Sequence, residues 1–257
     1  TPMIHGEAQA QIQEFAKNKD LRRQIRSGEL QPGETLQAER TLAERWGISR
    51  GTAVRALDAL VAEGLVTPGN TRAGRKVRDM RVLPIHASLT EQMERRKAAG
   101  VDAWVADTQD VGRTPGQSID VGVVQADEEI VRWLEVPADA PVAVRRRLRT
   151  LDGEPNNRAD TYYPMDIAQA IPEILDPSDV TQGVLALMAE RGYVTEHYVD
   201  ALRWRPPTPE EAQMLRIGQG VSVLIQARTG YMDGQPLHLT RTVWPGNTVE
   251  LRYELPA

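Results

Sequence analysis

The 257-residue sequence predicts an α+β protein of two domains, a small helical N-terminal domain and a larger domain built on an antiparallel sheet. The length suits one large domain or two smaller ones. Residues 1–83 carry 14 basic and 10 acidic side chains, whereas residues 84–257 carry 17 and 26. Within the second part, residues 134–164 recur as residues 215–245, at a constant offset of 81. The charge balance and the repeat therefore distinguish a basic N-terminal part from an acidic C-terminal part that contains an internal repeat.

The composition excludes several classes of protein. The sequence has no cysteine, which excludes a disulfide scaffold, a thiolate zinc site and a cysteine nucleophile. It contains no run of about 18 apolar residues, and its first residues lack the apolar core of a signal peptide. We therefore expect a cytoplasmic protein without a membrane partner.

The N-terminal pattern predicts three short helices and a hairpin. The first two helices are expected at residues 20–27 and 38–46. Ser49 is placed to cap a third helix that runs up to Gly64. Because only three residues separate the second helix from the third, the pair predicts a helix-turn-helix. The short strands expected at 65–67 and 76–78 would form a wing, which gives a winged helix-turn-helix DNA-binding domain over residues 1–78.

A linker is predicted at residues 79–87, where no period is evident and Pro84 interrupts the chain. Ser88 and Glu91 are spaced as a capping box for a helix that ends near Gly100. The second domain is accordingly expected to span residues 88–257.

Each copy of the repeat predicts a capped helix followed by a hairpin. Asp127 and Thr208 occupy equivalent helix starts, and the Asp-Gly turns at 152–153 and 233–234 coincide. An additional helix is expected at about residues 180–191. Two such units joined by one helix predict an antiparallel sheet, with a ligand cleft near the pseudo-twofold axis.

Strand alternation within the first copy predicts a polar face. Val142 and Val144 would lie on a core-facing side, and Arg145, Arg147 and Arg149 on the opposite side. An arginine in this position often serves as a solvated cross-strand partner, which is the alternative to ligand binding.

Two sets of motifs resemble known families. The segment GELQPGETLQAERTLAERWGISRGTAVRALDALVAEGLV, residues 28–66, resembles the winged helix-turn-helix of the GntR family of bacterial transcription regulators. The segments RRLRTLDGEP, TYYP, LMAERG and ARTGYMDGQP resemble the UTRA effector-binding domain of the HutC-type subfamily, whose fold is similar to chorismate lyase. The resemblance implies a DNA-binding regulator, most often a repressor, that responds to a small molecule.

An arginine at the start of a helix in the major groove can bind guanine through two hydrogen bonds, and Arg50 is so placed. Val54 stands where the family has a second arginine, and Arg55 comes one residue later, so we expect an operator that differs from the family's commonest one. Ion pairing with neighbouring acids is the alternative role for Arg40, Arg45 and Arg55. A homodimer on an inverted repeat is expected, because one head offers too little contact for specific binding. The predicted DNA-binding residues are Arg40, Ser49, Arg50, Gly51, Thr52, Arg55, Arg72, Arg75 and Lys76.

The UTRA resemblance also implies an effector site. Its two arginines before the Asp-Gly turn correspond to Arg147 and Arg149, and a helix start near Ser88 would hold an anionic group on backbone N–H groups. His238 stands where the family often has an acidic residue, which argues against a sugar-type effector. The predicted effector-binding residues are Ser88, Leu89, Thr90, Arg147, Arg149, Thr161, Tyr163, Tyr231 and His238.

The sequence indicates no catalytic residue, metal site or cofactor, because its four histidines fall in no base or metal motif. An effector is expected to act by reshaping the linker and changing the spacing of the two DNA-binding heads. Two alternatives remain at this level. One is a chorismate lyase-like enzyme that acts on a small anionic substrate, and the other is a constitutive plasmid-type repressor with a vestigial pocket.

Overall fold

The computed structural model describes residues 20–69, 74–88 and 102–255. The chain divides into two compact units, one of residues 1–81 and 206–222, the other of residues 82–205 and 223–257. Residues 206–222 group with the first unit, although in the sequence they connect two strands of the second unit's sheet. The domain boundaries expected from the sequence remain predictions.

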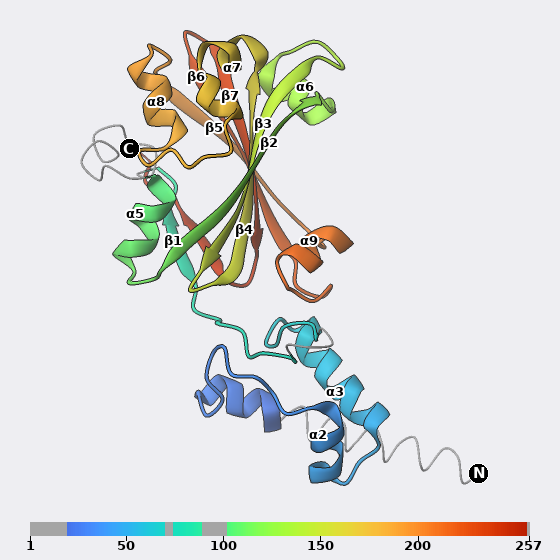
Figure 1. Ribbon diagram of the computed structural model, residues 1–257. Helices are drawn as coiled ribbons and strands as arrows, with labels where there is room; N and C mark the ends of the chain where they lie inside the picture. Colours follow the sequence, from blue (N-terminus) through green and yellow to red (C-terminus); the bar gives the residue numbers. More distant parts are fainter. Residues whose placement is uncertain (1–19, 70–73, 89–101, 256–257) are drawn as a thin grey trace. The chain divides into compact units, whose positions relative to one another are not determined.

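The first unit contains the three helices that the sequence predicts. Residues 20–27 are helical, α2 spans Glu39–Trp46 and α3 spans Arg50–Ala62 (Figure 1). Gly47 ends α2 with φ = 64°, a left-handed conformation that glycine adopts without strain. Leucines and valines from all three helices and from the wing close one core, whose fully buried members include Leu57, Leu60 and Val66.

The wing of this unit is short. Val66 pairs with Val77, as expected from the sequence, and Thr35 pairs with Lys76. The second pair was not predicted, because a strand of one or two residues between turns leaves no periodic pattern. Arg78 anchors the wing by donating a 3.0 Å hydrogen bond to the Gly64 carbonyl.

The second unit is built on a six-stranded antiparallel sheet with the order β2-β3-β4-β7-β6-β5. A second, parallel pair joins β1 to β8. The strands are β1 Leu83–His86, β2 Pro115–Gln125, β3 Pro141–Leu151, β4 Glu154–Pro164, β5 His197–Arg205, β6 Val223–Met232, β7 Gln235–Pro245 and β8 Val249–Arg252.

The strand order and the register of the sheet follow the predicted repeat. Hairpin β3–β4 and hairpin β6–β7 occupy positions that differ by 81 residues, and so do their register shifts after Arg149 and Gly230. Asp160 pairs with its own repeat equivalent, Arg241, in the central β4–β7 pair. The sheet order is therefore symmetric about that pair, and the internal repeat predicted from the sequence is confirmed as a pseudo-twofold.

The helix starts follow the same offset. Asp127 caps α6, which spans Glu128–Leu134, by accepting a 2.8 Å hydrogen bond from the Ile130 N–H. Thr208 and Glu211 form a full capping box at α9, which spans Pro209–Met214. Both caps are as the sequence predicts.

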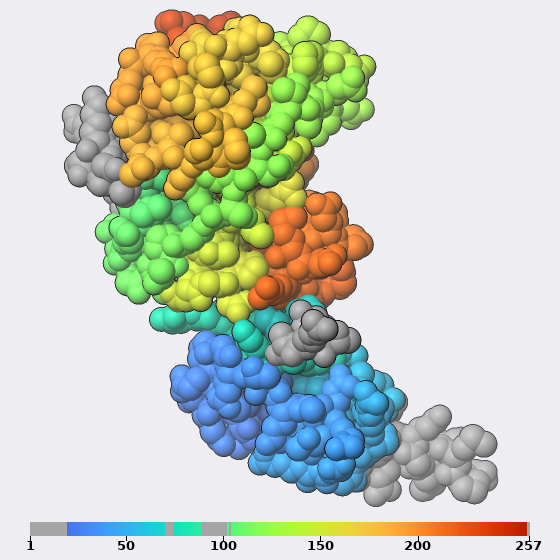
Figure 2. All heavy atoms as spheres, in the orientation of Figure 1, coloured from blue at the N-terminus to red at the C-terminus, as the bar shows by residue number. Residues whose placement is uncertain are grey.

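Helices cover both faces of the sheet. On one face α6 packs with Val142, Val144 and Leu239. On the other face α7 (Met165–Ala170), the 3₁₀ helix η1 (Pro172–Leu175) and α8 (Val184–Glu190) pack with Ala143 and Tyr163. Figure 2 shows this yellow-to-orange segment spread over one part of the unit's surface. Elsewhere on that second face α5 (Ala103–Asp110), β1 and β8 enclose a smaller core with Trp104 and Trp244.

Three expectations from the sequence need correction. The predicted linker contains strand β1, which is held by pairing with β8 and which Pro84 does not interrupt. The face with Arg145 is not solvated at that point, because Arg145 is buried and donates to the carbonyls of Glu173, Asp176 and Ser178. The helix expected from about residue 180 begins at Val184, after Gly183 in a left-handed conformation (φ = 82°).

Candidate functional site

The first candidate site is the N-terminal end of α3. Ser49 caps this helix, since its Oγ accepts a 3.1 Å hydrogen bond from the Thr52 N–H. Arg50 follows the cap with 74% of its side chain exposed, and Arg40 on α2 is 84% exposed. Arg55 is exposed too and places Nη2 3.3 Å from the Thr52 hydroxyl, so it reaches back toward the same helix end. The structure thus presents a capped helix terminus with exposed guanidinium groups.

Glu39 organises the approach to this helix end. Its carboxylate lies 3.5 Å from Arg50 Nη2 and 3.5 Å from Arg75 Nη2. Arg75 also forms a 2.7 Å ion pair with Asp58, and only 14% of its side chain is exposed. Arg75 therefore links the wing to α2 and α3 through these ion pairs, and the DNA contact expected from the sequence remains a prediction.

Thr52 also departs from expectation, because it is 3% exposed and its hydroxyl lies 2.9 Å from Ser49 Oγ. Its side chain faces the helix cap and the core instead of the solvent. Gly51 is exposed, and Lys76 is half-buried in the wing. Arg72 lies outside the described residues.

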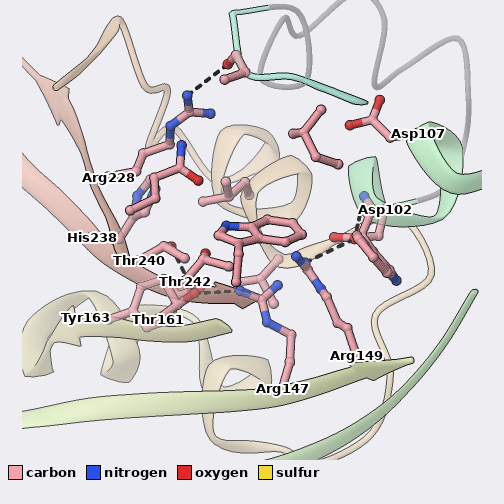
Figure 3. Close-up of a pocket in the computed structure, with 18 of the residues that line it drawn as sticks. Asp102, Asp107, Arg147, Arg149, Thr161, Tyr163, Arg228, His238, Thr240 and Thr242 are labelled. Atoms are coloured by element: carbon pink, nitrogen blue, oxygen red, sulfur yellow. Dashed lines mark hydrogen bonds and ion pairs between the residues drawn. The ribbon is translucent and has the colours of Figure 1, made fainter. Parts of the chain in front are cut away.

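The second candidate site is a cavity of about 100 Å³ in the second unit. One water molecule needs only about 10–15 Å³ of such space, so the cavity has room for a small organic molecule. Its floor is one face of the sheet, and its walls come from β1, α5 and the start of α8. The polar and aromatic lining residues are Asp102, Trp104, Asp107, Arg147, Arg149, Thr161, Tyr163, Gln182, Gln226, Arg228, His238, Thr240, Thr242 and Trp244 (Figure 3).

Two arginines of β3 bring positive charge to one end of the cavity, which Asp102 and Asp107 also line. Figure 3 shows Arg147 and Arg149 rising from the same strand. Arg147 Nη2 donates a 2.6 Å hydrogen bond to the Thr161 hydroxyl, and no carboxylate in the described part of the chain lies within ion-pair distance of Arg147. Arg149 lies 3.6 Å from Asp102 and 5.2 Å from the centre of the Trp104 ring. The Nε groups of both arginines are buried without an acceptor among the described residues.

The electrostatics of this end favour an anion. Burial, and then the like charge of Arg147, lowers the pKa of the Arg149 guanidinium. Burial also raises the pKa of the Tyr163 hydroxyl, which keeps it protonated as a donor. A bound anion would supply the missing acceptors and relieve the repulsion between the two arginines.

The cavity floor follows the pseudo-twofold of the sheet. Arg147 and Arg228 are repeat equivalents, and both line the cavity. Thr161 and Thr242 are also repeat equivalents that line the cavity, and so are Tyr163 and Trp244. The cleft expected near the pseudo-twofold axis is therefore present.

The two equivalent arginines have different partners. Arg228 donates to both oxygens of Asp200, at 2.8 and 2.6 Å, and to the Ala87 carbonyl at 2.8 Å. Burial alone would lower the pKa of Arg228, but the hydrogen bonds and charge of Asp200 outweigh it and raise the pKa. The charge of Arg228 is thus neutralised within the protein, whereas that of Arg147 is not.

The cavity brings together five of the predicted effector residues, namely Arg147, Arg149, Thr161, Tyr163 and His238. Two others lie elsewhere. Tyr231, near the end of β6, stacks on His197 of the edge strand at 5.0 Å between ring centres. Ser88 accepts a 2.9 Å hydrogen bond from the Glu254 N–H. Leu89 and Thr90 lie outside the described residues.

Several lining residues were not predicted from the sequence. Asp102, Trp104 and Asp107 lie on or next to α5, a helix that the sequence analysis did not predict. Arg228 and Thr242 could have been found, because the repeat aligns them with Arg147 and Thr161. The offset of 81 was the available signal.

No group of three or more potential metal ligands occurs within residues 20–69, 74–88 and 102–255. Over the same ranges, no helix is long and apolar enough to cross a membrane.

Comparisons with known proteins match two parts of the chain to different families. Residues 18–73 match the gntR family of bacterial regulatory proteins, and residues 112–250 match the UTRA domain. An HTH-type transcriptional regulator of Streptomyces coelicolor is 29% identical over 90% of this chain and 88% of its own length. The HTH-type transcriptional repressor NagR of Bacillus subtilis is 28% identical over 89% and 88%. The crystal structure of PhnF from Mycobacterium smegmatis superposes with a TM-score of 0.55 at 22% identity, covering 93% of this chain and 99% of PhnF.

Proposed function

Because the chain belongs to the GntR family of bacterial transcription regulators and carries a UTRA effector-binding domain, we propose that it binds an inverted-repeat operator as a homodimer and releases it when a small anion fills the cavity. Repression is the proposed mode of action, as the names of NagR and of other relatives state for those proteins.

The proposal for DNA rests on the exposed arginines at the end of α3. Arg50 stands directly after the cap, where a guanidinium can reach a guanine edge in the major groove. Arg40 and Arg55 supply further exposed charge for bases or phosphates, and the capped helix terminus can hold a phosphate on its N–H groups. An inverted repeat follows from two such heads related by a twofold axis.

The proposal for the effector rests on Arg147 and Arg149. Two buried guanidinium groups, one of them without an acidic partner among the described residues, favour a ligand that brings negative charge and acceptor oxygens. The other lining groups include hydroxyls, amides and indoles, together with the carboxylates of Asp102 and Asp107 and the imidazole of His238. We propose that they bind and orient a ligand without chemical conversion.

The first prediction concerns DNA. Duplexes selected by the chain from a random-sequence pool should share an inverted repeat. Binding measured by fluorescence anisotropy should weaken at least about tenfold between 50 and 200 mM salt, even if only two phosphates are neutralised. Selected duplexes without a shared sequence, or binding that is independent of salt, would contradict a regulator that reads DNA.

The second prediction concerns assembly. Sedimentation at micromolar concentration should give twice the chain mass of 28.6 kDa, and the complex should contain two chains per inverted-repeat duplex. A duplex that carries a single half-site serves as the control and should bind much more weakly. A monomer both with and without operator would rule out the homodimer.

A further inference from the structure

The contrast between Arg147 and Arg228 suggests that the two halves of the cavity have different tasks. Arg147 donates to the Thr161 hydroxyl and has no acidic partner among the described residues, so its charge is available to a ligand. Arg228 instead donates to the Asp200 carboxylate and to the Ala87 carbonyl. The arginine of the second repeat is therefore hydrogen-bonded to the backbone of Ala87, which forms part of the cavity wall. Gln226, next to Arg228 on the same face of β6, also lines the cavity and lies 3.3 Å from Asp200.

The polypeptide that Arg228 holds is the end of β1. The Ala87 N–H donates to the Arg252 carbonyl at 2.8 Å, and the Ala87 carbonyl accepts from Arg228 at 2.8 Å. One residue later, Ser88 accepts from the Glu254 N–H. Residues 87 and 88 are thus tied to the C-terminal segment on one side and to a cavity arginine on the other.

Asp200 and Tyr253 fix the orientation of this arginine. The Tyr253 hydroxyl donates a 2.7 Å hydrogen bond to the same Asp200 oxygen that binds Arg228 Nη2. The Arg228 guanidinium also lies 5.3 Å from the centre of the Tyr198 ring. Hydrogen bonds to Asp200 lower the pKa of that carboxyl against the effect of its burial, so the pair stays charged.

Chain connectivity gives this arrangement a consequence. Residues 82–87 follow directly after the first unit, whose N-terminal part ends at residue 81. A ligand oxygen bound near Gln226 and Arg228 would compete with the neutral Ala87 carbonyl. A charged acceptor forms the stronger hydrogen bond with a guanidinium.

We propose that Arg228, positioned by Asp200, transmits occupancy of the cavity to the DNA-binding unit by releasing the Ala87 carbonyl when a ligand acceptor takes its place. This regulation rests on the proposed function, because it requires a cavity ligand and a DNA-binding unit. Arg147 binds the ligand, and Arg228 converts binding into a change at residues 83–88.

Arg228→Gln tests the proposal in the full-length chain without any ligand, since it imitates the released state. Hydrogen exchange should become at least about tenfold faster at amides 83–88 and 249–254 and stay unchanged at 115–125. Affinity for the duplex selected by the wild type should fall by about 5- to 150-fold, the usual range of allosteric coupling. Arg146→Gln is the matched control, because Arg146 pairs with exposed Asp120, and it should match the wild type in both measurements.

Tyr253→Phe provides a second, milder variant, since it removes one hydrogen bond to Asp200 and leaves Arg228 in place. If Arg228→Gln accelerates exchange throughout the sheet, the variant is generally destabilised. Tyr253→Phe is then measured in the same two ways and tests the proposal in its place. Unchanged exchange at 83–88, or duplex affinity within twofold of the wild type, would overturn the role of Arg228. A wild-type chain that selects no duplex would instead contradict the proposed function itself, so the two failures are distinguishable.

Discussion

Arg50→Ala should abolish selective recognition of the operator while leaving the fold intact. A guanidinium that binds guanine through two hydrogen bonds contributes about 1–3 kcal/mol of discrimination per base pair, and a homodimer loses this twice. Arg50 is mostly exposed, and its 3.5 Å contact with Glu39 is worth at most about 1 kcal/mol of stability. We therefore expect affinity for the selected duplex to fall toward that for random DNA, with a melting temperature within a few degrees of that of the wild type.

Arg26→Ala is the matched control, because Arg26 is also exposed in the first unit and its removal changes the net charge equally. It should weaken binding to selected and random duplexes by a similar small factor. If Arg50→Ala behaves in the same way, Arg50 contacts phosphate or solvent only, and base reading must be assigned to Arg40 or Arg55.

Arg147→Gln should remove the anion response. A panel of small phosphates and carboxylates, screened by thermal shift, first identifies an anion that stabilises the wild type. Loss of Arg147 should then lower the affinity for that anion about 10- to 150-fold, because a hydrogen bond to a charged group contributes about 1.5–3 kcal/mol. Without ligand the variant should be no less stable than the wild type, since it relieves the repulsion with Arg149.

The adjacent Arg146→Gln again serves as control, since Arg146 is on the opposite side of β3 and forms a 2.9 Å ion pair with Asp120. It should leave anion affinity unchanged in calorimetry. Equal losses in both variants would point to general charge rather than a specific site. An Arg147→Gln variant that binds the anion as the wild type does would move the effector away from this end of the cavity.

Short local sequence patterns were sufficient to predict many elements of the fold. Ser49, Asp127 and Thr208 cap helices where the sequence places caps, because a cap needs only a side-chain oxygen and a backbone N–H two or three residues later. The repeat fixed the two hairpins and their Asp-Gly turns for a similar reason. Strand β1 and helix α5 were missed, since their residues pack against elements distant in the sequence and show no clear period of their own.

The candidate site was predicted only in part. The positions of Arg147 and Arg149 before an Asp-Gly turn identified them, and both line the cavity. Tyr231 has the right residue type, but pairing with the edge strand stacks it on His197 instead. Arg75 has the right charge, yet Asp58 and Glu39 bind it. Residue type predicts what a side chain can bind, whereas its neighbours decide what it does bind.

The sequence by itself determined the family, the helix caps, the two-copy sheet and the arginines of the recognition helix and of β3, because these depend on spacing along the chain. Only the tertiary structure decided that the two equivalent arginines, Arg147 and Arg228, have different hydrogen-bond partners. Arg147 meets a hydroxyl, and Arg228 meets Asp200 from β5 and the Ala87 carbonyl from the end of β1. Those partners lie 28 and 141 residues from Arg228 in the chain, so only the folded sheet brings them within hydrogen-bond distance.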